Sequence, residues 1–264
     1  VTGKKKAESP ELVNLRRQHG RALLEKQLAA HDKSAGLPVV SCEDHTPGLG
    51  QFADPATMRR WLVSDEGMTE SQAAAHVADL RSDRETRVDV RAATLAWLGE
   101  LASAKRMLLF GHDVATPEEA HELANRGCAV AEFPTTLAAA RAARELGLLI
   151  VAGAPNVVRG GSHAGNVSAA QLVATGLVDA LASDYLPAAM LAAAVRLVRD
   201  GVATLPQSVR LVTSGPARCV GLDDRGTLHE GARADLVIAD LSGTWPVVHA
   251  VVRAHDSAST GSRR

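Results

Sequence analysis

The sequence predicts an α/β fold with a parallel sheet and a small appended β unit. From residue 107 onward, short apolar runs alternate with stretches of helical periodicity, which is the pattern of strand–helix–strand units in parallel sheets. The character changes near the end, where residues 226–240 and 246–252 read as three short strands without a helix. This tail predicts a separate β unit beyond the α/β part.

Composition limits the classes of protein that the chain can belong to. Of its 264 residues, 46% are hydrophobic but only 3% are aromatic, so Ala, Val and Leu must fill the core. Lys and Arg number 29 against 30 acidic residues, and this balance excludes a nucleic-acid binder that works by bulk positive charge. The length suits one large α/β domain, or one domain with a small appendage.

The cysteines and the apolar runs indicate a cytoplasmic protein without a membrane partner. The three cysteines are widely spaced, which predicts a reducing compartment without a disulfide framework or a clustered zinc site. No apolar run approaches the ~20 residues that span a membrane, and no signal peptide is visible. Because the first residue is Val rather than Met, we expect the natural beginning to be missing.

The first elements are expected to be a helix and a short strand. Residues 1–9 are charged and polar and predict a solvated tail. Residues 10–32 predict a helix, since their leucines fall roughly on one face. Residues 37–42 form a short apolar strand that runs into a polar turn.

Helices dominate the next section of the chain. Asp54 followed by Pro55 predicts a helix start, with Asp as the cap and Pro at the first helical position. Helical pattern then continues to Ala104, with expected breaks near Gly67 and Arg87.

The following part has a regular rhythm. Thr116 and Pro117, with Glu119, supply a cap, a first-turn proline and a capping-box partner for one helix. Strands are expected over 107–110, 128–133, 148–152 and 178–183, and helices over 116–126, 137–146, 169–175, 188–199, 206–213 and 215–221.

The stretch from Gly153 to Ser168 is rich in glycine and polar residues and joins an apolar strand to a short helix. Glycines let the backbone approach a ligand, and arginine offers a fork of donors suited to phosphate. We therefore interpret it as an anion-binding loop, the alternative being a glycine-rich surface connection. The residues expected to bind substrate are Asn156, Arg159, Gly160, Gly161, Ser162, His163 and Asn166.

Metal-ligand residue types follow three expected strands. His45, His112 and Asp184 each come one or two residues after an apolar run, and parallel α/β folds gather reactive groups at such strand ends. Together they suit a divalent cation such as zinc or manganese, although each alone has a structural alternative. Asp184 would also suit a general base. Glu132 and Thr135 either face the same mouth or serve as a strand end and a helix cap.

Several motifs together resemble one family. The likeness lies in residues 44–52, 111–113, 131–136, 153–169, 182–187 and 224–237. These segments are similar to the PhnM family of phosphonate-metabolism diphosphatases, in the amidohydrolase superfamily. The resemblance implies a metal-dependent (β/α)8 barrel of TIM type with a small β domain. It also implies hydrolysis of α-D-ribose 1-methylphosphonate 5-triphosphate to the 5-phosphate and diphosphate, in the carbon–phosphorus lyase pathway. His45 and His112 match metal histidines of that family, and Asp184 matches its catalytic aspartate.

The chain also departs from that family. Superfamily members carry a first metal motif, of the His-x-His type, on the opening barrel strand, and no counterpart exists here. About five β/α units are visible where a closed barrel needs eight, so we expect a partial, N-terminally truncated barrel. The expected divisions are an unmatched helical segment (1–36), the partial barrel (37–222), the β unit (223–253) and a disordered tail (254–264).

Three functions remain open from the sequence. The first is the metal-dependent hydrolysis of an acid anhydride in a small phosphorylated substrate. The second is a truncated, non-catalytic homologue that binds phosphate ligands. The third is another amidohydrolase, such as a cyclic-amide hydrolase or a deacetylase. The sequence also leaves open whether the chain forms a homo-oligomer.

Overall fold

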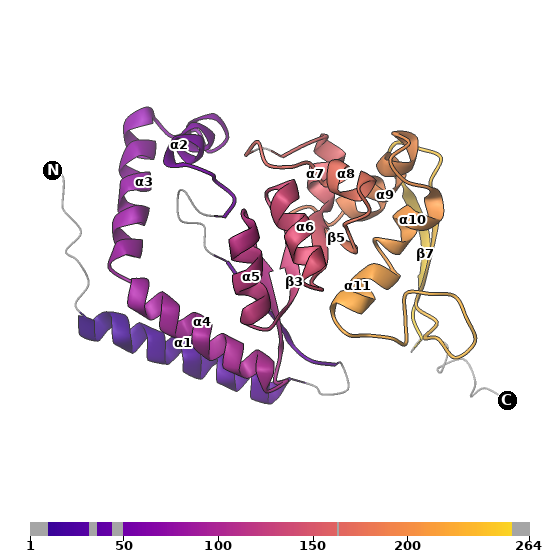
Figure 1. Cartoon of the computed structure of the whole chain (residues 1–264). Helices are drawn as coiled ribbons and strands as arrows, with labels where there is room; N and C mark the ends of the chain where they lie inside the picture. Colours follow the sequence, from indigo (N-terminus) through magenta and orange to yellow (C-terminus); the bar gives the residue numbers. More distant parts are fainter. Residues whose placement is uncertain (1–9, 32–35, 44–49, 163, 255–264) are drawn as a thin grey trace.

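The protein contains a five-stranded parallel sheet and a separate two-stranded antiparallel sheet, seen in a computed structural model that describes residues 10–31, 36–43, 50–162 and 164–254 (Figure 1). The parallel sheet has the order β1-β2-β3-β4-β5. Its strands are β1 (Val39–Cys42), β2 (Leu108–His112), β3 (Cys128–Glu132), β4 (Leu149–Gly153) and β5 (Ala180–Ala182). The predicted class, a partial α/β barrel with a small C-terminal β unit, is confirmed; the domain boundaries remain a prediction.

Among the residues that the structure describes, four helices precede β2. They are α1 (Pro10–Ala30), α2 (Pro55–Ser64), α3 (Glu70–Glu85) and α4 (Val88–Ser103). The helix α1 lies along α4, where Arg21 donates to the Ala93 carbonyl at 2.8 Å and stacks over Trp97 (Figure 1). Asp54 caps α2 by accepting from the Thr57 amide at 2.7 Å, so the predicted helix start is confirmed.

Helices follow each strand from β2 to β5, and all of them except α7 were predicted. They are α5 (Pro117–Asn125), α6 (Leu137–Glu145), α7 (Ala154–Arg159), α8 (Ala169–Ala174), α9 (Ala189–Arg199), α10 (Leu205–Arg210) and α11 (Ser214–Cys219). Thr116 caps α5 by accepting from the Glu119 amide, whereas the Glu119 carboxylate accepts from Ala115. No helix in these described ranges is long and apolar enough to cross a membrane.

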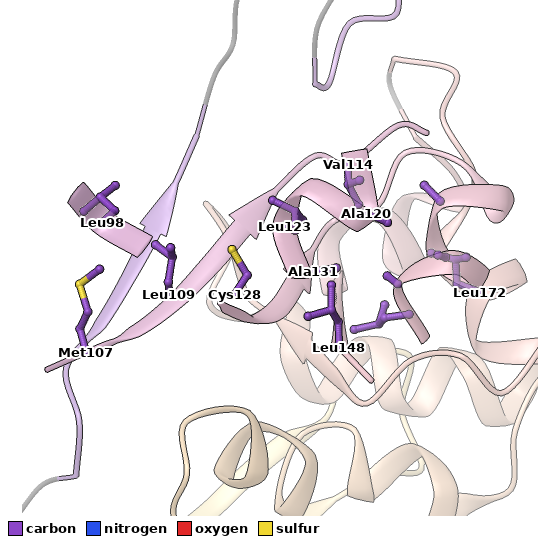
Figure 2. Close-up of a cluster of buried hydrophobic side chains, with 14 of the residues drawn as sticks. Leu98, Met107, Leu109, Val114, Ala120, Leu123, Cys128, Ala131, Leu148 and Leu172 are labelled. Atoms are coloured by element: carbon purple, nitrogen blue, oxygen red, sulfur yellow. The ribbon is translucent and has the colours of Figure 1, made fainter. Parts of the chain in front are cut away.

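Small apolar side chains fill the core on both faces of the sheet. On the face covered by α5 and α6, Leu109 and Ile150 share one buried cluster with three alanines of α6, Ala139, Ala140 and Ala143, each 0% exposed. Figure 2 shows part of this cluster, including Leu109, Leu123 and Leu148. The opposite face buries another set of strand residues, Phe110, Val130, Val151 and Ala180, in one cluster with Cys219 of α11. Successive side chains of a strand thus point to opposite faces of the sheet. The expected core of Ala, Val and Leu is present.

One buried carboxylate ties several elements together at the start of β5. Asp179 has a side chain only 5% exposed and accepts from the Ile150 backbone amide at 2.8 Å. The guanidinium groups of Arg144 and Arg218 both bond to it. This network joins α6, β4, β5 and α11.

Two expected elements differ in the structure. The first third of the predicted anion-binding loop is the helix α7, because Pro155 suits a first helical turn and Gly160, with φ of 88°, closes it in the left-handed conformation. In the tail, only β6 (Leu236–Asp240) forms within 226–240, and it pairs antiparallel with β7 (Val247–Val252). The residues before β6 form turns instead, in which the Arg233 amide donates to the Asp224 carbonyl.

Candidate functional site

A cavity of about 350 Å³ opens at the carboxyl ends of the parallel strands. Parallel strands all end on the same edge of the sheet, so side chains that follow different strands meet there. His112 ends β2 and pairs in register with Glu132 at the end of β3, and Glu43 follows β1. Ser41 on β1 donates to the Glu132 carboxylate at 2.6 Å, which links the first and third strands across His112.

The His112 imidazole is held on three sides. Its Nδ1 lies 3.0 Å from Oδ2 of Asp113, its Nε2 lies 3.7 Å from Oε1 of Glu43, and the Phe133 ring meets it edge-on, with centroids 5.0 Å apart. Burial by itself lowers the pKa of His112. The Asp113 carboxylate and the charges of Glu132 and Glu43 outweigh burial, so the pKa of His112 is raised overall.

Three residues at this edge have left-handed backbone although none is glycine. They are Asp113, Phe133 and Asp184, with φ of 56°, 54° and 47°, and each lies one or two residues after a strand. Such conformations cost on the order of 1–3 kcal/mol and persist where the surroundings hold them. Here the Asp113 amide donates to the Glu132 carbonyl, and the Phe133 amide donates to the Val151 carbonyl, both at 2.8 Å. The strained turns bring side chains from neighbouring strand ends to one cavity.

The opposite wall of the cavity comes from α7 and the segment after β5. Arg159, at the end of α7, donates to the Tyr185 hydroxyl at 2.6 Å. Asp184 precedes Tyr185, is exposed, and lines the same cavity as Arg159 and His112. A guanidinium and an exposed carboxylate therefore line the same cavity as the imidazole.

Some of the predicted substrate ligands also hold the chain together. Asn156 accepts from the Ala169 amide at 2.9 Å, and Ser162 accepts from the Ala164 amide at 3.1 Å. The Asn166 side chain donates to the Gln51 carbonyl at 2.9 Å. These bonds fix the stretch between α7 and α8 against the segment before α2, so they shape the cavity wall.

The cavity gathers most of the predicted site residues that the structure describes. It is lined by His112, Asn156, Arg159, Gly161, Ser162, Asn166 and Asp184. Gly160 ends α7 and is not among the lining residues. The predicted ligands His45 and His163 lie outside the described residues.

Glu43, Phe133 and Tyr185 were not among the predicted site residues, yet they line the cavity. The signal that identified His112, a polar residue directly after an apolar strand, also applies to Glu43. The roles of the two aromatic residues depend on their contacts with His112 and Arg159, which sequence spacing does not encode.

The donor set for a metal is incomplete in the described part of the chain. Nε2 of His112 and Oε1 of Glu43 come within 3.7 Å, but no group of three or more His, Cys, Asp or Glu side chains in the described ranges could hold an ion. A catalytic zinc site uses three protein ligands. These residues alone therefore do not complete such a site.

Comparison with known proteins places this chain in a class of hydrolases. The profile of the amidohydrolase family matches residues 52–258, and the chain belongs to that family. It is 41% identical over 210 residues to the alpha-D-ribose 1-methylphosphonate 5-triphosphate diphosphatase of Escherichia coli (strain K12), a match that covers 77% of this chain and 53% of that protein. The resemblance inferred from the motifs is thereby confirmed.

Two other similarities are more limited. A dihydroorotase of Geobacter metallireducens is 34% identical over 92 residues, covering 27% of this chain and 22% of the relative. A crystal structure of an uncharacterized protein shares 18% identity with a TM-score of 0.46, covering 61% of this chain and 47% of that one. The chain thus spans about half, or less, of the length of the curated relatives it matches.

Proposed function

We propose that the chain takes part in hydrolysing α-D-ribose 1-methylphosphonate 5-triphosphate to the 5-phosphate and diphosphate. One observation carries this proposal: His112, Asp184 and Arg159 line a single cavity in a chain 41% identical to a diphosphatase for that compound. An imidazole and a carboxylate can transfer protons, and a guanidinium can stabilise negative charge, in the hydrolysis of a phosphoric anhydride.

In this proposal Arg159 binds the charged phosphoryl groups. The Tyr185 hydroxyl fixes one end of its guanidinium and leaves further N–H donors for phosphate oxygens. Gly161 and Ser162 line the cavity beside it, where the lack of a side chain at Gly161 lets phosphate come close to the backbone. Arg159, Gly161 and Ser162 thus bind the phosphoryl groups, and Arg159 neutralises their charge.

Asp184 and His112, which line the same cavity, supply the groups that handle the proton. Asp184 accepts a proton from the attacking water as that water's oxygen bonds to phosphorus. The anhydride P–O bond then breaks and diphosphate leaves with the bonding electron pair. Asp113 holds Nδ1 of His112, so that Nε2 is directed away from it.

The family implies a divalent metal, and we propose zinc or manganese held by His45, His112 and Asp184. When bound, such an ion supplies Lewis-acid activation of water and stabilises developing negative charge. The support is that His112 and Asp184 line the same cavity. Calorimetric titration with zinc or manganese tests the assignment. The substitution His112→Ala should weaken metal binding. The control substitution His76→Ala, of an exposed histidine on α3, should leave metal binding unchanged.

The experiment that tests the function is an assay of diphosphate release from the ribose triphosphate. We expect turnover in the chain with added divalent metal and a loss of at least a hundredfold in His112→Ala, with His76→Ala as the matched control. An unchanged rate in His112→Ala would refute the assignment of this cavity.

A second candidate function is phosphate-ligand binding without catalysis. It is favoured by the incomplete donor set among the described residues and by the chain's match to only 53% of the diphosphatase. Under this alternative, the ribose triphosphate binds with an Arg159-dependent affinity but is not hydrolysed at any metal concentration.

A further inference from the structure

A second cavity, of about 710 Å³, adjoins the candidate site. It is bounded by α3, α4, α5 and β2, and its lining includes Glu43, His112 and Asp113, which also line the first cavity. The two cavities therefore adjoin at Glu43, His112 and Asp113. A ligand that extends past these residues would contact both.

Four arginines line the second cavity. Arg84 lies near the end of α3, Arg87 and Arg91 lie at the start of α4, and Arg126 follows α5. The chain around Arg126 packs closely on α4, since a Cβ at Gly99 would lie 3.1 Å from the Arg126 carbonyl oxygen and 3.2 Å from its Cγ. Three different helices thus bring guanidinium groups to one cavity.

Two of the acidic residues in this cavity form only weak pairs with the arginines. Asp83 lies 3.8 Å from Arg87, and Glu122 lies 3.9 Å from Arg126, with carboxylates 66% and 69% exposed. Exposed pairs of this kind are worth about 0–1 kcal/mol.

The other carboxylates of this cavity also have protein contacts. The Glu119 carboxylate accepts from the Ala115 amide at 2.7 Å, and Asp113 and Glu43 flank His112. Each guanidinium has five N–H donors, so an arginine can keep its protein contacts and still bind an anion.

We propose that Arg84, Arg87, Arg91 and Arg126 form the binding site for the diphosphate part of a polyphosphate ligand. This inference rests on the proposed function and deepens it. The proposed substrate carries anionic groups at both ends, and Arg159 supplies a guanidinium on only one side of His112. A cluster of guanidinium groups on the other side matches the more highly charged end, because bidentate arginine contacts suit phosphate oxygens. The bond to be broken then lies near His112, and the released diphosphate stays among the arginines.

Calorimetric titration of the 264-residue chain with inorganic diphosphate tests this site without requiring catalysis. The double variant Arg87→Gln/Arg91→Gln should bind diphosphate at least about tenfold more weakly, since each charge-assisted bond is worth more than a factor of ten. The matched control is Arg81→Gln, which is exposed on α3 and lines neither cavity, and its affinity should stay within twofold. Arg159→Gln should lose less affinity than the double variant. Arg84→Gln, on another helix, provides a second test if the double variant has a lowered Tm.

Three results would overturn the proposal: no diphosphate binding by the wild-type chain, equal affinity in wild type and all arginine-cluster variants, or a larger loss in Arg159→Gln than in the double variant. The outcome is separable from that of the hydrolysis assay. Diphosphate binding through the cluster without turnover would support this site and refute the proposed hydrolysis. Turnover, with a diphosphate affinity that does not depend on the four arginines, would support the proposed hydrolysis and refute this binding site.

Discussion

The guanidinium of Arg159 donates a 2.6 Å hydrogen bond to the hydroxyl of Tyr185, which joins the end of α7 to the turn after β5. Without this bond the long Arg159 side chain would sample many rotamers before binding phosphate. We expect Tyr185→Phe, which removes only the hydroxyl, to raise KM for the ribose triphosphate by about fivefold to tenfold, equivalent to about 1 kcal/mol. Its kcat should change less than twofold. Steady-state kinetics give both values, and an equal loss in kcat would contradict a purely positioning role.

The contact between Asp113 and Nδ1 of His112 predicts a positioning effect on metal binding. Carboxylates that orient a metal-binding histidine typically contribute 10–100-fold to metal affinity. Asp113→Asn should weaken zinc or manganese binding by about that factor, because it removes the charge while asparagine tolerates the left-handed backbone at φ of 56°. Direct metal titration measures the affinity. Tm measured beside it checks that the fold is intact, and undiminished affinity would refute the role.

The buried Asp179 predicts a large effect on stability. Asp179→Ala leaves the Ile150 amide without its side-chain acceptor and removes a shared partner of Arg144 and Arg218. We expect the free energy of unfolding to fall by about 2–3 kcal/mol. The exposed Asp200, paired with Arg196 one turn away, is the matched control, and Asp200→Ala should cost less than about 0.5 kcal/mol. Urea unfolding measures both, and similar losses would contradict the prediction.

Two buried thiols predict a dependence of stability on alkaline pH. Burial raises the pKa of Cys128 and of Cys219 from 9.0 to about 11. Folding therefore favours the neutral thiols over the thiolates. The stability that comes from this difference in pKa is complete below pH 9 and is lost as the pH rises towards 11. Urea unfolding of the wild type and of Cys128→Ala/Cys219→Ala between pH 8 and 11 tests this. The fall in stability should be smaller in the variant, and identical pH profiles would contradict it.

Most of the helices and strands were predictable because their signals are local. The cap at Asp54, the first-turn Pro117 and the apolar strand runs each specify an element within a few residues. The helix α7 was missed because its six residues were interpreted by their neighbouring glycines, although Pro155 and Gly160 mark its start and end. The prediction of two strands within residues 226–240 was wrong for one of them, because an alternation of apolar residues alone does not supply a neighbouring strand to pair with.

The site was predictable only in part. Placement at strand ends predicted that His112 and Asp184 lie together, and both line one cavity, since parallel topology brings strand ends to one edge. The left-handed turns at Asp113 and Phe133 depend on backbone bonds to neighbouring strands. The amides of Asn156 and Asn166 looked like ligand donors, yet both bond to distant backbone groups. Residue type alone does not distinguish a side chain that binds a ligand from one that holds the chain.

The three fully buried alanines of α6, Ala139, Ala140 and Ala143, set a limit on evolutionary change in this layer. A helix seated on a sheet by methyl groups has no space into which a larger side chain could turn. Exchange of one of these alanines for a larger apolar residue would push α6 away from β4. Sequence drift in this layer is therefore confined to the smallest residues, and the alanine-rich composition of the chain is in part a steric requirement.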